Sequence, residues 1–327
     1  MSVVVVGSAN LDLIYRVRRL PQSGETVLAM GADSAPGGKG NNQATAAARA
    51  GAPTTFIAAV GHDSAADLIV SSLILSGVEY RVRAVNAETG TALITVGEDA
   101  NNTIVVNQGA NRELLELDAH DQRAIVNARV LLLQLEIPLE TVTEAARIAH
   151  DAGTLVVLNA APMCPLPSDL LAAVDVLIVN ESEAAELAHA LHIDKSFTAR
   201  NDRDAEPPVG DEEHLAQTLT SLGVAVIVTL GPRGALVCVQ SALPVSIEGI
   251  RVSAVDTTGA GDTFCGALVA AMDKDSPRWQ GRGGSLLESL VRAAEFATVA
   301  AALAVQRPGA VPSIPTLNEI EDFRTRP

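Results

Sequence analysis

The stretch VLLLQLEIPLETVTEAARIAHDAGTLVVLN, residues 130–159, contains two short apolar runs separated by a segment of helical length. Unbroken apolarity over 130–135 and 155–158 is typical of strands that are buried on both faces, and 139–152 has the length and alanine content of a helix. A strand, a helix and a second strand in this order form a parallel pair with a right-handed crossover. This stretch therefore predicts an α/β fold.

The same alternation continues in both directions from this unit. Further apolar runs are expected to be strands, and they lie at 3–6, 55–60, 174–179 and 224–230. The Ala-rich stretches between them are expected to be helices, at 42–50, 65–76, 181–191 and 213–222. We therefore expect a single layered α/β/α, Rossmann-like domain over residues 1–327, with a central and mostly parallel sheet.

Two segments, at about 13–36 and 89–108, break the alternation. The second carries an alternating pattern on both sides of a polar turn at 97–102, which is a hairpin signal. Antiparallel pieces beside a parallel sheet predict a small antiparallel β-sheet that projects as a lid, and lids exclude water from a site. The polar segment 195–213 is expected to be a surface loop.

The strongest candidate site is Asp256-Thr257-Thr258-Gly259-Ala260-Gly261-Asp262-Thr263-Phe264, which precedes an apolar helical run at 265–272. The N–H groups of Gly259, Ala260 and Gly261 at the positive end of a helix dipole would form an anion hole. Asp262 in the first turn could accept a proton from an attacking hydroxyl while the N–H groups stabilise a transferred phosphoryl group. The alternative is an Asp that only stabilises the helix start, but such an Asp does not require Gly-Ala-Gly before it.

A second glycine-rich turn, Gly37-Gly38-Lys39-Gly40-Asn41-Asn42-Gln43-Ala44, precedes an Ala-rich helix. Glycines at a helix start let backbone N–H groups approach a ligand closely. The turn is not a Walker loop, because Gly40 follows Lys39 where Ser or Thr belongs. Gly-rich turns before helices are common, so this motif alone is a moderate signal.

Several polar residues follow expected strands, at the edge of the sheet where ligands bind in open α/β folds. Asn10 and Asp12 follow the first strand and could bind the hydroxyls of a sugar, although this motif alone favours a polar turn. Glu136 and Asn159 close two later strands. A polar residue at a strand end is by itself weak support for a site.

Two further motifs have strong structural alternatives. Asn180-Glu181-Ser182-Glu183 could give Asn180 a phosphate contact and Glu183 a water-mediated hold on Mg²⁺, but Asn followed three residues later by Glu is also a capping box. The turn Thr229-Leu230-Gly231-Pro232-Arg233-Gly234 suits close approach by a nucleotide, and an ordinary hairpin turn would have the same sequence. The pattern alone favours the cap at the first motif and leaves the second open.

Composition excludes several partner classes. The net charge of −16 at pH 7 disfavours nucleic acid and anionic membranes as partners. Aromatic residues make up only 2% of the chain, so there are few aromatic side chains on which the bases of a single-stranded nucleic acid could stack. Three cysteines without CxxC spacing argue against a disulfide framework or a zinc site. The N-terminus has no signal-peptide pattern and no apolar stretch reaches a membrane span, so we expect a cytoplasmic protein that binds small molecules.

The two glycine motifs, in this order and at this separation, resemble the ribokinase family within the phosphofructokinase-B-type carbohydrate kinases. The likeness extends from about residue 3 to residue 315, and the stretches 7–12 and 109–111 (Gly-Ala-Asn) favour ribokinases over fructokinases or adenosine kinases. The resemblance implies a ribokinase-like fold and transfer of a phosphoryl group from ATP to the 5-hydroxyl of D-ribose. It also implies Mg²⁺, a potassium ion and a homodimer formed through the lid.

The resemblance assigns roles residue by residue. Asp262 is the base, with Gly259, Ala260 and Gly261 as the anion hole. The ribose contacts are Asn10, Asp12, Gly38, Lys39, Gly40, Asn42, Glu136 and Asp262. The ATP site is Asn180, Thr229, Leu230, Gly231, Pro232, Arg233, Gly234, Gly261, Asp262 and Thr298. Potassium is placed at Asp256, Thr258, Ala304, Arg307, Gly309 and Ser313, and Mg²⁺ at Glu183 through water.

The departures from the family pattern lie on the nucleotide side. Ala160 and Ala161 stand in a stretch that is usually Asn-Pro-Ala-Pro, Pro232 replaces a small polar residue, and Thr298 stands where Asn or His is frequent. Two other functions stay open at this point. One is a kinase for deoxyribose, another pentose or a nucleoside, since one hydroxyl contact can separate such substrates. The other is a sugar-binding regulator without catalytic activity.

Overall fold

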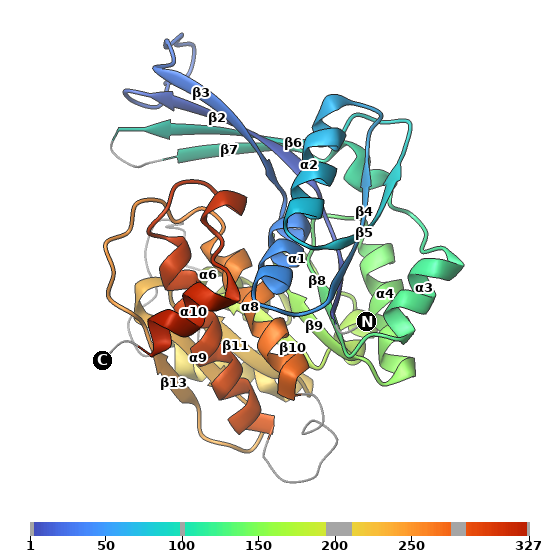
Figure 1. The fold of residues 1–327 in the computed structure, drawn as a ribbon. Coiled ribbons are helices and arrows are strands. Elements are labelled where there is room, and N and C mark those ends of the chain that lie inside the picture. Colours follow the sequence, from blue (N-terminus) through green and yellow to red (C-terminus); the bar gives the residue numbers. More distant parts are fainter. Residues whose placement is uncertain (1–2, 99–101, 194–210, 276–285, 326–327) are drawn as a thin grey trace.

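A computed structural model describes residues 3–98, 102–193, 211–275 and 286–325, and its centre is a nine-stranded sheet (Figure 1). The strand order is β13-β12-β11-β10-β9-β8-β1-β4-β5. The strands are β1 (Val3–Val6), β4 (Thr54–Val60), β5 (Glu79–Ala84), β8 (Val130–Leu133), β9 (Leu155–Asn159), β10 (Val176–Asn180), β11 (Ala225–Thr229), β12 (Gly234–Cys238) and β13 (Val245–Glu248).

The sheet is parallel from β5 through to β11, and its other edge is antiparallel, because β12 pairs antiparallel with both β11 and β13. This confirms the mostly parallel sheet expected from the apolar runs. Parallel order brings the carboxyl ends of β1, β8, β9, β10 and β11 to one edge, where ligands bind in open α/β sheets.

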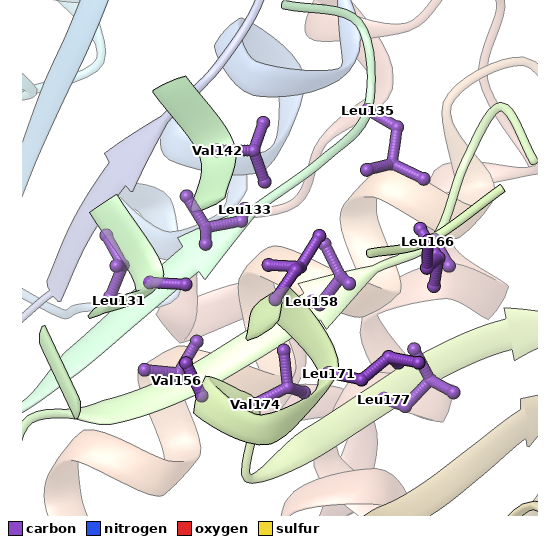
Figure 2. Close-up of a cluster of buried hydrophobic side chains, with 14 of the residues drawn as sticks. Leu131, Leu133, Leu135, Val142, Val156, Leu158, Leu166, Leu171, Val174 and Leu177 are labelled. Atoms are coloured by element: carbon purple, nitrogen blue, oxygen red, sulfur yellow. The ribbon is translucent and has the colours of Figure 1, made fainter. Parts of the chain in front are cut away.

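Both faces of this sheet are covered by helices, so strand residues alternate between two hydrophobic cores. One core joins Leu131, Leu133 and Leu158 to α3 (Ala119–Val126), α4 (Leu139–Ala152), α5 (Ser168–Ala173), α6 (Glu181–Ala190) and α7 (Asp211–Leu219), and Figure 2 shows part of it. The other core joins Leu132 and Val157 to α1 (Lys39–Arg49), α2 (Ser64–Leu75), α8 (Ala260–Asp275), α9 (Leu286–Ala304) and α10 (Leu317–Arg324). Burial on two faces explains why these strands read as unbroken apolar runs.

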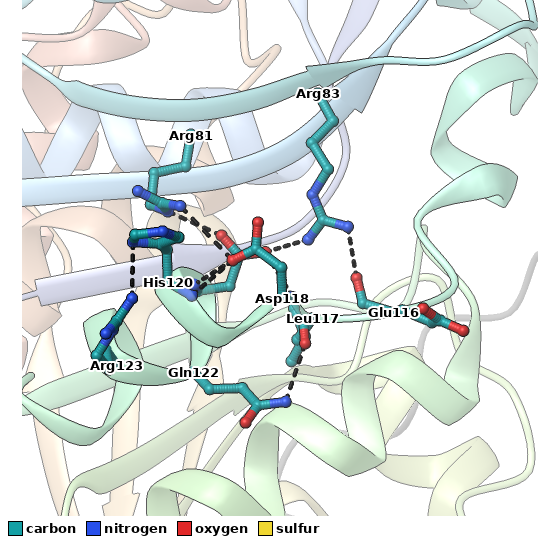
Figure 3. A network of polar contacts seen from close by, with 9 residues as sticks. Arg81, Arg83, Glu116, Leu117, Asp118, His120, Gln122 and Arg123 are labelled. Atoms are coloured by element: carbon teal, nitrogen blue, oxygen red, sulfur yellow. Dashed lines mark hydrogen bonds and ion pairs between the residues drawn. The ribbon is translucent and has the colours of Figure 1, made fainter.

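The start of α3 ties the sheet edge to a helix through a buried carboxylate (Figure 3). Asp121 is 1% exposed and accepts hydrogen bonds from Arg81 and Arg83 of β5. It also accepts from the backbone N–H of Asp118, while the Asp118 side chain accepts from the N–H of Asp121, which is a capping box. Arg83 extends the contact to the carbonyl of Glu116.

A second, four-stranded sheet extends away from the large one (Figure 1). It contains β2 (Asn10–Val17), β3 (Gly31–Gly37), β6 (Gly90–Gly97) and β7 (Asn102–Asn107), in the order β3-β2-β6-β7. Its two outer pairs are antiparallel, and its central pair, β2 with β6, is parallel. The parallel centre arises because β2 follows β1 and β6 follows β5, two strands that run in the same direction within the large sheet.

Some boundaries differ from those expected. The first segment of the small sheet begins at Asn10 rather than near residue 13, so Asn10 and Asp12 lie on a strand and not in a turn. Of the expected loop 195–213, residues 195–210 lie outside the described part of the chain, and 211–213 form the first turn of α7. No helix in the described residues is long and apolar enough to cross a membrane.

Candidate active site

The N-terminus of α8 has the glycine backbone expected of an anion site. Gly259, just before the helix, has a positive φ of 74°, and a Cβ there would lie 3.0 Å from the Cβ of Ala310. A Cβ on Gly261 would meet no atom within 4 Å, so its backbone faces open space. The first N–H groups of a helix have no partner within it. The N–H of Ala260, however, already donates to the carbonyl of Thr257 at 3.2 Å, so Gly261 is the more available donor.

Asp262 is held in the first turn of α8 by two amides of α1. Its Oδ2 accepts from Asn42 Nδ2 at 2.9 Å and its Oδ1 accepts from Gln43 Nε2 at 3.0 Å. The side chain is 8% exposed. Two donated hydrogen bonds fix the carboxylate beside the anion-binding backbone, so the residue does more than begin a helix.

Gln43 belongs to a buried amide chain that sequence reasoning did not assign to the site. Its Nε2 also donates to Asn159 Oδ1 at 3.0 Å, and its Oε1 accepts from Gln134 Nε2 at 2.7 Å. The position of Gln43 next to Asn42 in the glycine motif was the available signal. For Gln134 the signal was a polar residue inside an apolar run.

Lys39 is the first residue of α1, and its backbone N–H donates to Glu136 Oε2 at 3.1 Å. Ser8 Oγ donates to the same oxygen at 2.5 Å, so Glu136 is fixed between the end of β1 and the start of α1. Gly38 caps this helix with a φ of 86°, and a Cβ there would lie 2.9 Å from the backbone nitrogen of Asn10. The glycine is therefore required by both its conformation and the close approach of β2.

The side chain of Lys39 lies among carboxylates. Burial alone would lower the pKa of Lys39, but the charges of Asp262, Glu136 and Glu183 together raise it above its ordinary value. The ammonium group therefore stays charged at neutral pH. It provides a cation close to the α8 N-terminus.

Asn10 is oriented by Asn111, a buried residue to which sequence reasoning gave no role. Asn111 Nδ2 donates to Asn10 Oδ1 at 2.7 Å, and Asn111 Oδ1 accepts from the N–H of Ala9 at 2.9 Å. Gly90 leaves room for this contact, since a Cβ there would lie 2.3 Å from both side chains. With its oxygen bonded to Asn111, Asn10 keeps its own NH₂ group to offer to a ligand.

Asp12 lies beside Asn10 on β2, in a crowded and acidic place. Burial, with smaller effects from the charges of Glu136 and Asp262, raises its pKa to about 7. Its carboxylate packs against Gly37, where a Cβ would lie 2.2 Å from one carboxylate oxygen. The carboxylates of Asp12, Glu136 and Asp262 are thus close enough for their charges to act on one another.

A cavity of about 160 Å³ joins these elements. It is lined by Lys39, Asn159, Ala161, Ile178, Asn180, Glu183, Thr229, Thr257, Gly259, Ala260, Gly261, Asp262 and Cys265. Asn10, Asp12, Asn42 and Glu136 are not in its lining. Asn42 and Glu136 bond to the lining residues Asp262 and Lys39. A cation, helix N–H groups and a carboxylate at one cavity suit transfer of an anionic group to a hydroxyl.

At the start of α6 the capping box is present. Asn180 Oδ1 accepts from the N–H of Glu183 and Glu183 Oε2 accepts from the N–H of Asn180, both at 2.8 Å. Both residues also line the cavity, and burial raises the pKa of Glu183 despite the nearby Lys39. The cap therefore does not exclude a ligand contact, because the same residues also face the cavity.

The turn 229–234 joins the antiparallel strands β11 and β12, so it is a hairpin turn. Only Thr229 of this turn lines the cavity. Arg233 pairs with Glu181 and with Glu212 on α6 and α7. Thr298, on α9, uses its hydroxyl to donate to the carbonyl of Ala294 at 2.8 Å and does not line the cavity.

Asp256 contacts two of the other expected potassium residues, Thr258 and Gly309. Its Oδ1 accepts from the N–H of Thr258 at 2.9 Å and its Oδ2 accepts from the N–H of Gly309 at 2.8 Å. Burial would raise the pKa of Asp256, but these hydrogen bonds lower it below its ordinary value. The contact brings the loop after α9, with Arg307 and Ser313, against the loop before α8.

Known proteins are similar to this chain along nearly its whole length. Residues 1–317 match the pfkB family of carbohydrate kinases. A ribokinase of Staphylococcus aureus is 36% identical over 323 residues, covering 97% of this chain and 98% of the relative. A ribokinase of Schizosaccharomyces pombe is 37% identical over 333 residues, covering 98% of this chain and 97% of the relative. The structure of Arabidopsis thaliana ribokinase complexed with ribose and ATP has a TM-score of 0.84 and 34% identity, and covers 100% of this chain and 99% of its own.

Proposed function

This chain belongs to the pfkB family of carbohydrate kinases, and from that premise we propose that it transfers a phosphoryl group from ATP to the 5-hydroxyl of D-ribose. The products are D-ribose 5-phosphate and ADP. Two relatives named ribokinase at 36% and 37% identity, and a similar structure that holds ribose and ATP, support this substrate pair. The observation that carries the proposal is Asp262, fixed by Asn42 and Gln43 beside the α8 N-terminus.

In the proposed reaction the ribose 5-hydroxyl loses its proton to Asp262 as its oxygen attacks the γ-phosphorus of ATP. The bond from the γ-phosphorus to the bridging oxygen breaks, and ADP leaves. Of the N–H groups at 259–261, that of Gly261 is the most available, and with the Lys39 ammonium it would face the charge that develops on the transferred group. Asn10, Asp12 and Glu136 supply the polar groups that would hold the sugar hydroxyls.

Magnesium belongs to this proposal as the partner of ATP. Within the described part of the chain, no group of three or more His, Cys, Asp or Glu side chains could hold a metal ion. Mg²⁺ is commonly bound by one or two carboxylates together with substrate phosphates and water, which fits a site where Glu183 reaches it through water. The ion would neutralise charge on the phosphates.

Potassium is proposed at Asp256 and the loop after α9. A hard cation needs oxygen donors, and an ionised carboxylate among backbone carbonyls provides them. The hydrogen bonds from Thr258 and Gly309 hold this carboxylate where the two loops meet. The expected donors are Asp256, Thr258, Ala304, Arg307, Gly309 and Ser313.

The four-stranded sheet is proposed to act as the lid and as a homodimer contact. Tyr15, Leu93, Ile104, Val105 and Val106 on its strands are exposed apolar side chains, which favours a partner surface there. Closure over the cavity would exclude water that otherwise hydrolyses ATP. A cytoplasmic location is part of the same proposal.

An ADP-release assay over D-ribose, 2-deoxyribose, other pentoses, hexoses and nucleosides, with K⁺ or Na⁺, tests this function. The proposal predicts the highest kcat/KM with ribose and higher turnover in K⁺. A better rate with deoxyribose or a nucleoside would refute the ribose assignment. Ribose binding without ADP release would identify a sugar-binding regulator instead.

A further inference from the structure

Arg49, the last residue of α1, joins three separate parts of the chain. Its Nη1 donates to the carbonyl of Val311 at 2.9 Å and to the carbonyl of Ile314 at 3.0 Å. Its Nη2 donates to Ser76 Oγ, at the end of α2, at 3.2 Å. Arg49 is half-buried, and its backbone lies on the helix that begins with Lys39.

The two carbonyls belong to a loop that supports the anion-binding turn. Ala310, directly before Val311, is the residue against which Gly259 packs, with 3.0 Å between the Ala310 Cβ and the position of a Cβ on Gly259. Ser313 Oγ and the N–H of Ser313 both donate to the carbonyl of Ala310, at 2.7 Å and 3.2 Å. Movement of the loop 310–314 would therefore shift the backbone of Gly259.

Arg49 thus connects the two helix starts that make up the active site. One end of α1 carries Asn42, which fixes the Asp262 carboxylate. The other end carries Arg49, which holds the loop packed on Gly259. We propose that Arg49 is a positioning residue for phosphoryl transfer, because it fixes the anion-binding turn in register with α1. This role rests on the proposed kinase function.

An arginine suits this role better than a lysine. The planar guanidinium presents several N–H donors in a fixed fork, so one side chain can bind two carbonyls and a hydroxyl at once. A lysine ammonium is a point donor on a flexible stem and would hold one carbonyl less rigidly. Burial lowers the pKa of Arg49, with Arg307 acting in the same direction and Glu319 opposing it, but an arginine remains charged in proteins.

The test compares Arg49→Met, Arg49→Lys and Ser76→Ala in the full-length enzyme. Arg49→Met keeps the apolar stem and removes every donor. Ser76→Ala is the matched control, since it removes one partner of Arg49 and leaves both bonds to the loop. For each variant, kcat and the KM values for ribose and ATP are measured together with Tm, so that turnover is separated from stability.

We expect Arg49→Met to lower kcat by about 10-fold to 100-fold, the scale of a small misplacement in a reacting site, with an unchanged ribose KM. Arg49→Lys should show a smaller loss in the same direction, and Ser76→Ala should retain the wild-type kcat. A lower Tm with wild-type kcat in Arg49→Met would overturn the proposal and leave a structural role. If Arg49→Met does not fold, wild-type kcat in Arg49→Lys overturns it equally. A wild-type enzyme inactive on ribose would instead refute the proposed function.

Discussion

Replacing Asp262 by Asn removes the proposed base while keeping the shape of the side chain. General-base catalysis contributes about 10²-fold to 10⁴-fold to a rate, which corresponds to about 2.7 to 5.4 kcal/mol in the activation free energy. We therefore expect kcat to fall by that factor. The ribose KM should change little, because all of the expected ribose contacts other than Asp262 itself remain in the variant.

The structure also predicts how the variant is accommodated. Asp262 accepts from Asn42 and Gln43, so an amide at 262 would place its NH₂ group against a donor. The Oδ1 atom of Asn42 is buried and has no hydrogen-bond partner in the described structure. Rotation of the Asn42 amide by half a turn would present that oxygen to the new NH₂ group. We expect the stability of Asp262→Asn to stay close to that of the wild type.

The assay is ADP release at saturating ribose and ATP, with Tm and ribose binding by calorimetry as controls. A large loss of kcat in a protein with wild-type Tm and ribose affinity supports the base. Near-normal turnover would refute it, since the carboxylate would then only fix the helix start. A large fall in Tm would contradict the predicted rotation of Asn42.

Three further changes test other parts of the structure. Because the pKa of Asp12 is raised to about 7 from 3.8, the folded state holds a proton there that the unfolded state has lost, so stability should fall as pH rises from about 4 to about 7. Urea unfolding at pH 5 and pH 8 should show a smaller fall in Asp12→Asn than in the wild type, the difference being roughly 2.7 kcal/mol for a folded-state pKa of about 7, and equal falls would contradict the shift. Asp121→Ala leaves Arg81 and Arg83 of β5 without their buried partner, so it should lower the free energy of unfolding by roughly 3 kcal/mol. The kcat should stay unchanged, and an altered kcat would show that this network affects the active site. Asn111→Ala removes the donor that orients Asn10, so it should raise the ribose KM by about 10-fold, which corresponds to about 1.4 kcal/mol. The kcat should change little. An unchanged ribose KM would exclude a positioning role for Asn111.

The main sheet could be predicted from the sequence because its strands are buried on both faces. A run such as 130–135 is apolar except for Gln134 and so marks a strand, although the structure ends that strand at Leu133. Beyond Leu133, Gln134 bonds to Gln43 and the N–H of Leu135 donates to the carbonyl of Ala161. Side-chain contacts of this kind are not encoded in local apolarity.

The small sheet shows which strand pairings local sequence patterns can predict and which they cannot. The hairpin of β6 and β7 is visible as an alternating segment, and the antiparallel pairing of these two strands follows from it. The parallel pairing of β2 with β6 joins Asn10 to Gly90, which lies 80 residues later in the sequence (90 − 10). No local sequence signal specifies that partner. It depends on where β1 and β5 lie in the large sheet.

The candidate site residues also fall into two groups, those that a local motif indicates and those that depend on contacts between distant parts of the sequence. Asp262 and Lys39 were predictable because glycines and a charged residue at a helix start have a known chemistry. Asn111 and Arg49 were not, since each acts through contacts with residues far away in sequence. At Asn180 the pattern indicated a cap, and the structure contains that cap at the edge of the cavity.

The central claim concerns which atom receives the phosphoryl group, and product analysis tests it most directly. The purified protein is incubated with D-ribose, ATP, Mg²⁺ and K⁺, and the product is examined by ³¹P NMR with coupling to the sugar protons. We predict one new phosphate monoester coupled to the two protons on C5 of ribose, formed together with ADP. A phosphate at another position, or ADP formed without a ribose phosphate, would contradict the account.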